Sequence, residues 1–217
     1  MGVPIPSRTP KKSLLGRPRQ ARSRDALEKL VAAGEELLAA HEYESAAVGE
    51  IARRAGSSVG SFYRLVGDKD RLLRAIHDRF LEDSHAQLES DLSPARFAGK
   101  TPVAIVRAFV GLLVEIHARR EGLLRALIVR SSAEPEFRAR VHALNDALES
   151  RLAALLAPHR ARIGHPRQRE AIRFGLRVVL GALNQNTFVH SPESRDASLL
   201  ARELARVLVS YLALEGE

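Results

Sequence analysis

The spacing of apolar residues is the feature that most restricts the fold of this chain. From Ser23 onward, apolar side chains recur at steps of three and four residues, which is the period of an α-helix with one buried face. No stretch keeps the two-residue alternation of a half-buried strand for long enough to predict a sheet. The pattern therefore predicts an all-α protein of about nine helices.

Proline, glycine and hydroxyl residues divide this pattern into separate helices. We expect helices from Ser23 to a break at residues 41–45, and then over about residues 46–55, 58–65, 69–91, 102–118, 122–131, 135–157, 166–190 and 192–214. Gly56 is placed for the left-handed turn that ends a helix. The candidate N-cap residues are Ser45, Ser57 or Ser58, Asp68, and Thr101 followed by Pro102.

The first 24 residues are strongly basic, whereas the rest of the chain is nearly neutral. They contain seven of the 34 lysines and arginines and none of the 26 acidic residues, in a chain of net charge +8. Residues 1–22 also combine four prolines with few apolar side chains, so we expect a disordered basic arm there. Such an arm indicates a polyanionic partner, although a solvated tail has the same composition.

Several classes of function are disfavoured by what the sequence lacks. The chain has no cysteine, which excludes disulfides and thiolate metal sites. Its eight histidines are scattered, and no HExxH pair, nucleophile elbow, phosphate-binding loop or dinucleotide-binding glycine pattern is present. We therefore predict no enzyme activity, no metal and no cofactor. No apolar run is long enough to span a membrane and the N-terminus is not a signal peptide, so we expect a cytoplasmic protein.

Two short expected helices, 46–55 and 58–65, are joined by a turn that contains Gly56, which is the pattern of a helix-turn-helix. In such a motif the leading side chains of the second helix face base edges in the major groove of DNA. Gly60 lets the backbone approach DNA closely, and Phe62 is expected in the core. The pattern alone is a weak signal, because any three packed helices can show it. The candidate DNA-contacting residues are Ser57, Ser58, Val59, Gly60, Ser61, Tyr63 and Arg64, with Lys69 at the start of the next helix.

A longer run of residues carries a family resemblance. Its members are Tyr43, Val48, Ile51, Ala52, Ala55, Gly56, Ser58, Gly60, Ser61, Tyr63 and Lys69. They match, without a gap, an aromatic residue, a Val-x-x-Ile-Ala helix, an Ala-Gly turn, a Ser-x-Gly-Ser/Thr-x-Tyr recognition helix and a lysine that opens the fourth helix. In this spacing the chain resembles the tetracycline-repressor (TetR/AcrR) family of transcriptional regulators. The resemblance implies DNA contacts at Ser58, Gly60, Ser61, Tyr63 and Lys69.

The resemblance also implies an organisation and a function. Residues 23–68 would form a three-helix DNA-binding head, and residues 69–217 a linker helix and a helical domain for effector binding and dimerisation. The protein would be a homodimeric repressor, released from a palindromic operator by a small-molecule effector. The chain departs from the family pattern at three places. It has Ala46 and Ala47 where hydroxyl residues are usual, Leu65-Val66 where an aromatic residue is usual, and Glu42 where a glycine is common. These departures affect the expected operator affinity. The alternative is a helical dimerisation module or ligand-binding protein without specific DNA binding.

The arm contains a second candidate DNA contact. Gly16-Arg17-Pro18-Arg19 resembles the core of an AT-hook, an extended segment that lies in a narrow A·T minor groove. Such a groove concentrates negative potential and attracts arginine. Arg17 and Arg19 are therefore candidate minor-groove contacts, and a nonspecific basic tail is the alternative.

The last two expected helices carry apolar stripes that are candidates for a dimer interface. The stripes are Ile172, Leu176, Val179, Leu180 and Leu183 on the first, and Leu200, Leu204, Val207, Leu208 and Tyr211 on the second. Paired across two subunits they would form a four-helix bundle, or they serve the core of one subunit.

Effector-binding residues are less well determined by the sequence. The candidates are Phe109, His117, Phe137, His142 and Phe174. Three consecutive amide residues are unusual in an otherwise apolar helix: Asn184, Gln185 and Asn186. Their side chains would form hydrogen bonds across a dimer interface, bind the ligand or face water. The absence of tryptophan and the scarcity of aromatic residues favour an aliphatic effector.

Overall fold

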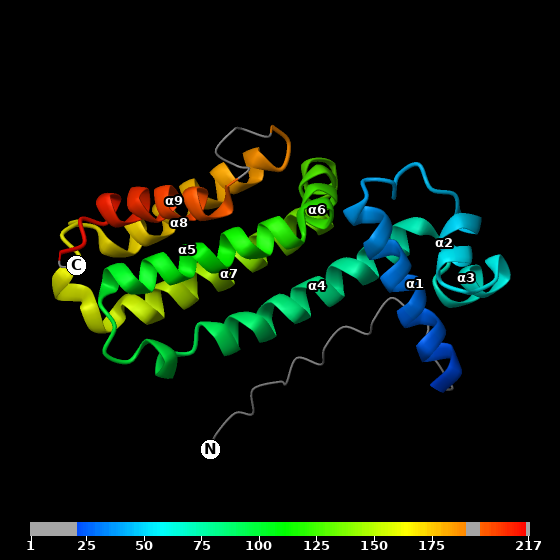
Figure 1. Ribbon diagram of the computed structural model, residues 1–217, viewed down its shortest axis with the longest axis horizontal. Coiled ribbons are helices and arrows are strands. Elements are labelled where there is room, and N and C mark those ends of the chain that lie inside the picture. The colour runs from blue at the N-terminus through cyan, green and yellow to red at the C-terminus, as the bar shows by residue number, and fades with distance from the viewer. Residues whose placement is uncertain (1–20, 190–195, 216–217) are drawn as a thin grey trace, which may run out of the picture. The chain divides into compact units, whose positions relative to one another are not determined.

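The computed structural model describes residues 21–189 and 196–215, and these form nine α-helices and two short 3-10 helices (Figure 1). The α-helices are α1 (Ala21–Ala39), α2 (Val48–Arg54), α3 (Val59–Leu65), α4 (Lys69–Asp91), α5 (Pro102–Arg119), α6 (Glu121–Ala133), α7 (Pro135–Leu156), α8 (Gln168–Asn186) and α9 (Ala197–Tyr211). The 3-10 helices are η1 (Pro94–Phe97) and η2 (Ala157–Arg162). Over these residues there is no strand, only an isolated bridge between Ile163 and Leu214. The all-α prediction is confirmed.

The chain divides into two compact units. The N-terminal unit comprises residues up to Leu37 and Glu42–Asp78, and the C-terminal unit comprises Leu38–His41 and Arg79–Glu217. The sequence placed this boundary before Lys69, at the start of α4, but the structure places it inside that helix. The reason is that Leu72 and Ile76, both fully buried, pack beside Gly34 of α1 in the N-terminal unit.

The expected N-terminal arm and the expected start of the last helix lie wholly or partly outside the described residues. Residues 1–20, which hold Arg17, Arg19 and most of the expected arm, lie outside them. Helix α1 begins at Ala21, so the last two residues assigned to the arm are helical. The expected start of the last helix at Pro192 also lies outside the described residues, and α9 begins at Ala197 after an Asp196 N-cap.

Local capping explains why the short helices begin and end where they do. Asp68 caps α4 by accepting from the backbone N–H of Arg71 at 2.7 Å, and Thr101 caps α5 by accepting from Ala104 at 3.2 Å. The expected cap at Ser45 is wrong, because α2 begins only at Val48. The Ser45 hydroxyl instead donates to the Glu42 carbonyl at 3.0 Å.

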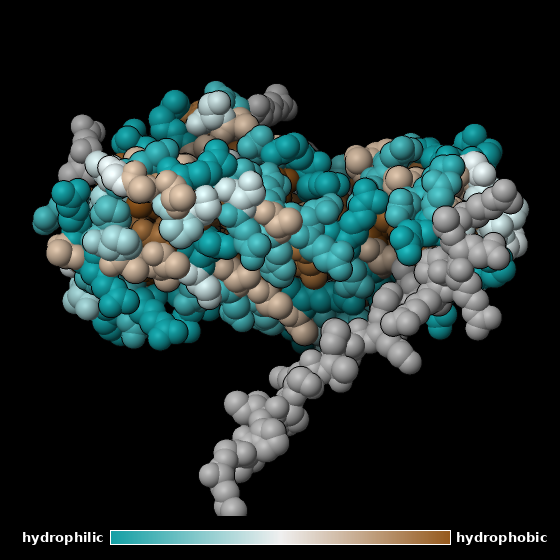
Figure 2. Space-filling view, turned by 90° about the horizontal axis from the view of Figure 1, so that it is seen from below, coloured by the Kyte–Doolittle hydropathy of each residue, from teal (hydrophilic) through white to brown (hydrophobic). Residues whose placement is uncertain are grey.

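The C-terminal unit is built around one apolar core. Helix α5 packs against α9, and α6 packs against α7. The fully buried members of this core are Val106, Phe109, Val110, Leu152, Leu156, Ala171, Val179, Leu208 and Leu212. Figure 2 shows one face of the molecule, on which hydrophilic residues cover most of the surface and apolar residues are exposed in small groups. Among the described residues, no helix combines the length and the apolar character that crossing a bilayer requires.

Candidate nucleic-acid interface and internal cavities

The turn between α2 and α3 is fixed by local hydrogen bonds. Gly56 adopts the left-handed conformation with a φ of 60°, which a residue with a side chain rarely adopts. Its N–H donates to the carbonyl of Arg53 at 3.1 Å, and the N–H of Ser57 donates to that of Ala52 at 2.8 Å. These are the two bonds of a Schellman motif. The turn expected at Gly56 is therefore present, and it sets the direction of α3.

Helix α3 has one buried and one exposed face. Phe62 is fully buried and Leu65 is 9% exposed, so they hold the helix on the N-terminal unit. Val59 and Tyr63 are 45% and 54% exposed, although their side chains are largely apolar. An exposed apolar surface on a charged protein commonly marks a binding site. Because residues 59 and 63 lie one helical turn apart, they share the outer face.

The first turn of α3 is held by a pair of serines. The backbone N–H of Ser61 donates to Oγ of Ser58 at 3.1 Å, and the Ser58 hydroxyl donates to Oγ of Ser61 at 3.0 Å. A Cβ atom added at Gly60 would find no atom nearer than Oγ of Ser58, at 4.0 Å. Close packing between helices therefore does not explain the glycine at position 60.

Lys69, expected to contact a DNA phosphate, is held inside the N-terminal unit by the loop before α2. Its ammonium group donates to the carbonyls of Tyr43, Glu44 and Ala46 at 2.7, 3.0 and 2.9 Å. An ammonium group has three N–H donors, and all three are used. The Tyr43 hydroxyl in turn donates to the Lys69 carbonyl at 2.7 Å. A direct phosphate contact would break these bonds, so the side chain ties the loop to α4.

The arginines at the end of α2 are paired with acids. Glu50 accepts from Arg53 at 2.7 Å and from Arg54 at 2.8 Å, and Arg54 also reaches Glu42 at 2.8 Å. The hydrogen bonds from Arg53, and then those from Arg54, lower the pKa of Glu50 to about 2. The Glu50 carboxylate therefore stays charged at neutral pH and offsets part of the positive charge beside the turn.

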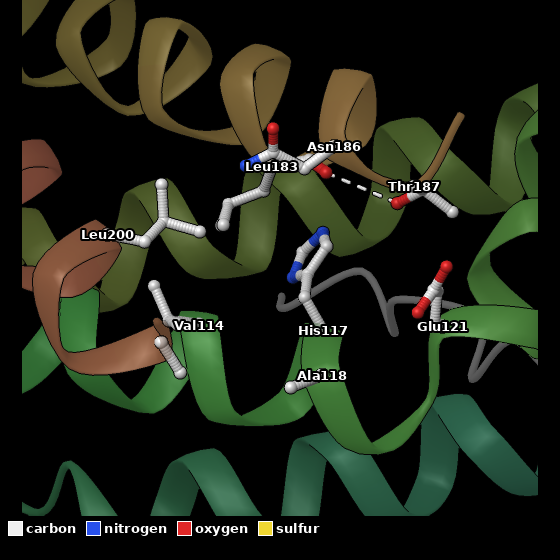
Figure 3. Close-up of a pocket in the computed structure, with 9 residues that line it drawn as sticks. Val114, His117, Ala118, Glu121, Leu183, Asn186, Thr187 and Leu200 are labelled. Carbon is white, nitrogen blue, oxygen red and sulfur yellow. Dashed lines mark hydrogen bonds between the residues drawn. The ribbon is translucent and has the colours of Figure 1, made fainter. Parts of the chain in front are cut away.

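The C-terminal unit contains a small, partly open cavity among α4 to α8, with a volume of about 60 Å³. Most of its lining is aliphatic, and the polar lining residues are Ser84, His117, Asn145 and Asn184. A second pocket of about 150 Å³ lies on the other side of His117, where Glu121, Asn186 and Thr187 contribute to its wall. Figure 3 shows the imidazole ring of His117 pointing from α5 toward α8 in this second pocket. We call the two spaces the inner cavity and the outer pocket.

His117 is the one predicted effector-binding residue that lines these spaces. Phe109 and Phe137 are 0% and 1% exposed and belong to the packed interior rather than to a cavity wall. His142 is exposed on α7, and Phe174 is 51% exposed on α8. These four residues do not line the inner cavity or the outer pocket, and their assignment as effector contacts stays a prediction. An apolar stripe alone does not reveal which of its residues packing places in the interior.

Both ring nitrogens of His117 face polar atoms. Nδ1 lies 3.0 Å from the Leu113 carbonyl oxygen, and Nε2 lies 3.4 Å from the Asn184 side-chain oxygen. Burial lowers the pKa of His117 below the usual 6.5, more than the bonds to Leu113 and Asn184 raise it. The neutral ring is therefore favoured, and its single proton can donate to only one of these two oxygens. We place it on Nδ1, toward the nearer Leu113 carbonyl, which leaves Nε2 and the Asn184 oxygen as two acceptors that face each other. The sequence feature that pointed to Asn184 is its amide side chain, which is unusual in an otherwise apolar helix.

The apolar stripes expected at a dimer interface lie mainly in the core of the single chain. On α8 all five stripe residues are buried, and on α9 Leu204 and Leu208 are buried too. The packing of one subunit therefore uses them. A different set is exposed, which we call the outer apolar face: Phe174, Val178, Val207 and Tyr211, at 51%, 42%, 50% and 37% exposure. The rings of Phe174 and Tyr211 lie 5.7 Å apart between centroids.

Metal binding finds no support in the described part of the chain, where no three metal-ligating side chains come together.

The Schellman turn, the buried Phe62 and the exposed face of α3 define a helix-turn-helix protein. Two family profiles narrow this class. Residues 30–76 match the bacterial regulatory proteins of the tetR family, and residues 101–212 match the tetracyclin repressor-like C-terminal domain. The chain belongs to the tetracycline-repressor family of DNA-binding transcriptional regulators.

Solved structures share this fold at low sequence identity. A putative TetR-family transcriptional regulator from Mesorhizobium loti has a TM-score of 0.72 at 17% identity, over 89% of this chain and 98% of that one. A transcriptional regulator from Rhodococcus sp. has a TM-score of 0.69 at 22% identity, over 88% and 99%. FadR from Bacillus subtilis, in complex with stearoyl-CoA, has a TM-score of 0.62 at 16% identity, over 87% and 99%. No curated protein sequence matches this chain.

Proposed function

We propose that this protein is a homodimeric repressor, released from a two-fold symmetric operator by a small molecule bound in the C-terminal unit. The observation that carries the proposal is that one helix, α4, contributes to both functions. Its first part supplies Leu72 and Ile76 to the unit that holds α3, and its later part supplies Ser84 and Leu88 to the inner cavity. A molecule that displaces the later part acts on a helix continuous with the DNA-binding unit.

The proposed DNA contacts are on the exposed face of α3. Val59, Gly60 and Tyr63 face outward and Arg64 is also exposed, while Ser57 and Ser61 are half-buried beside them. The Ser58 hydroxyl is already engaged with Ser61, so its remaining role is to hold the helix start. We leave Lys69 out of the contact set because its three donors are used within the protein.

The test of DNA binding starts from an operator selected from a random duplex library. The double variant Tyr63→Ala, Arg64→Ala should bind this operator about 10- to 100-fold more weakly, as expected for one base-edge or phosphate contact at each residue. Arg119→Ala, which removes an exposed arginine from α5, is the matched control. Equal affinity of the double variant and the control would refute the proposed interface, and a selected site without two-fold symmetry would refute the dimeric operator.

The arm is proposed to add contacts in the minor groove through Arg17 and Arg19. Each phosphate neutralised contributes roughly 0.9 to the slope of log affinity against log salt concentration. Replacing both arginines by alanine should therefore flatten that slope, and an unchanged slope would show that these two arginines make no such contact.

Dimerisation is proposed to use the outer apolar face. Exposed Phe174, Val178, Val207 and Tyr211 gather on two antiparallel neighbours, α8 and α9, as a four-helix interface requires. The variant Val178→Asp, Val207→Asp should sediment as a monomer with its helical content intact. Val129→Asp on α6, where the side chain is 53% exposed, is the control and should remain dimeric.

Effector release is supported by the inner cavity and by one structural relative. The Bacillus subtilis FadR structure contains stearoyl-CoA, so a protein of this fold binds a ligand with a long acyl chain. In this chain the proposed site is the inner cavity together with the outer pocket. The decisive measurement is operator affinity with and without compounds that bind the protein, and equal affinity for every such compound would exclude the switch.

A further inference from the structure

The lining of the inner cavity limits the chemistry of the effector, on the assumption that the proposed function holds. Aliphatic side chains from α4 to α8 form most of the wall, among them Leu88, Leu113, Leu127 and Leu148. Among the described residues that line it, there is no aspartate, glutamate, lysine or arginine. Burying an ion without a partner costs several kcal/mol or more, so an ionised group is excluded from this space.

The volume of the inner cavity limits the size of the buried part. It is about 60 Å³, whereas an apolar cavity of about 150 Å³ holds a benzene molecule. In proportion, a chain of about two or three carbon atoms is the largest apolar body that enters without moving the walls. Because the wall is mainly aliphatic, the shape suits a flexible alkyl group rather than a flat ring.

The polar side of the inner cavity can hold one hydrogen-bonding group. With the His117 proton on Nδ1, the Nε2 atom is an acceptor, and the Asn184 amide offers both a donor and an acceptor. The Nε2 atom and the Asn184 side-chain oxygen lie 3.4 Å apart, and as two acceptors they share no hydrogen bond that an incoming donor would have to break. A hydroxyl or a carboxamide satisfies both partners, because each of these groups can donate and accept.

The outer pocket offers no basic side chain among its described lining residues. Glu121 contributes a carboxylate to its wall. The guanidinium of Arg125 on α6 is committed to the fold, since it donates to the Thr187 carbonyl at 3.0 Å and lies 4.9 Å from the Phe188 ring centroid.

We infer that the effector is a short, uncharged aliphatic alcohol or amide, with its alkyl part in the inner cavity and its polar group on His117 and Asn184. In this arrangement His117, which lines both the inner cavity and the outer pocket, contacts the polar group of the ligand. Long acyl-CoA molecules are excluded by size and by charge.

The experiment compares probes of equal length on the full chain without DNA. Propan-1-ol, propionamide, propionate, propylammonium and stearoyl-CoA are titrated at pH 7.5, while the side-chain nitrogens of His117 are followed by NMR. The alcohol and the amide should bind at least about tenfold more tightly than either ion and shift the His117 signals. His117→Ala and Asn184→Ala should each reduce this preference, and His117→Asn provides a variant that retains a polar group. His142→Ala, which removes an exposed histidine from α7, is the control.

The outcomes separate this inference from the proposed function. Tighter binding of propionate or stearoyl-CoA, or no saturable binding of the alcohol and the amide, overturns the inference and leaves release by another effector possible. Selective binding of the alcohol or amide supports the inference. If these two probes bind selectively but leave operator affinity unchanged, the ligand class stands and the release of DNA by these ligands is refuted.

Discussion

The two units of this protein place their functional residues in different ways. In the N-terminal unit, the exposed face of α3 is set by neighbours in the sequence: the Gly56 turn, the Ser58 cap and the buried Phe62 all lie within seven residues of one another. In the C-terminal unit, His117 and Asn184 are 67 residues apart and meet only because α5 and α8 pack together. Local chemistry thus builds one site, and tertiary packing builds the other.

The largest expected effect tests whether the two faces of α3 are as distinct as their burial indicates. Phe62→Ala should lower the free energy of unfolding by about 3–5 kcal/mol, because a fully buried aromatic ring is removed. Tyr63→Ala, one residue away and 54% exposed, should lower it by only about 0.5 kcal/mol. Urea denaturation measures both, and similar losses would mean that α3 has no free face.

The next effect concerns Lys69, the residue on which sequence and structure differ most in this unit. Lys69→Met should lower the free energy of unfolding by about 2 kcal/mol, because three carbonyls lose a charged donor. Lys29→Met removes an exposed ion pair to Asp25 on α1 and should cost less than about 0.5 kcal/mol. If Lys69→Met leaves stability unchanged but weakens operator binding, the result would support the phosphate contact that the sequence predicts for Lys69.

A pH effect is expected in the C-terminal unit, where His117 is buried in neutral form. The pKa of His117 is lowered on folding, so below pH 6.5 the unfolded chain binds more protons than the folded one. The contribution of His117 to the free energy of unfolding is therefore fully present above pH 6.5, and it is lost as the pH falls toward the pKa of the folded state. Glu121, the charged side chain that lines the outer pocket with His117, would moderate the loss. Thermal unfolding of His117→Asn between pH 7.5 and 5.5 should show a weaker pH dependence than that of the parent chain.

The smallest effect separates the stability of α3 from its function. Gly60→Ala should raise the free energy of unfolding by about 0.5–1 kcal/mol, because alanine is the better helix former and the added Cβ meets nothing closer than 4.0 Å. The same change should weaken operator binding if the backbone approaches DNA at this position. Gly56→Ala is the contrast, since its φ of 60° makes alanine destabilising by about 1–2 kcal/mol. Unchanged operator affinity for Gly60→Ala would remove position 60 from the interface.

Most of the fold follows from local sequence signals. Helix α4 begins at Lys69 and ends at Asp91 as expected, with Asp68 as its cap, and α5 begins at Pro102 after Thr101. These boundaries depend on hydrogen bonds between residues three positions apart, so the sequence contains all their partners. Ser45 was misassigned because its hydroxyl has a competing local acceptor, the Glu42 carbonyl.

The sequence by itself determined the helical class, the turn at Gly56 and the residues that α3 presents. Only the tertiary structure decided that Lys69 donates to the loop before α2, that the α8 stripe is core, and that Phe174 and Val178 are exposed instead. It also decided that, of five candidate effector residues, His117 is the one that lines the inner cavity, beside Asn184, which is 67 residues away in the chain. The physical reason is that a helical repeat fixes which residues share a face, whereas the partner of that face is fixed by the packing of whole helices.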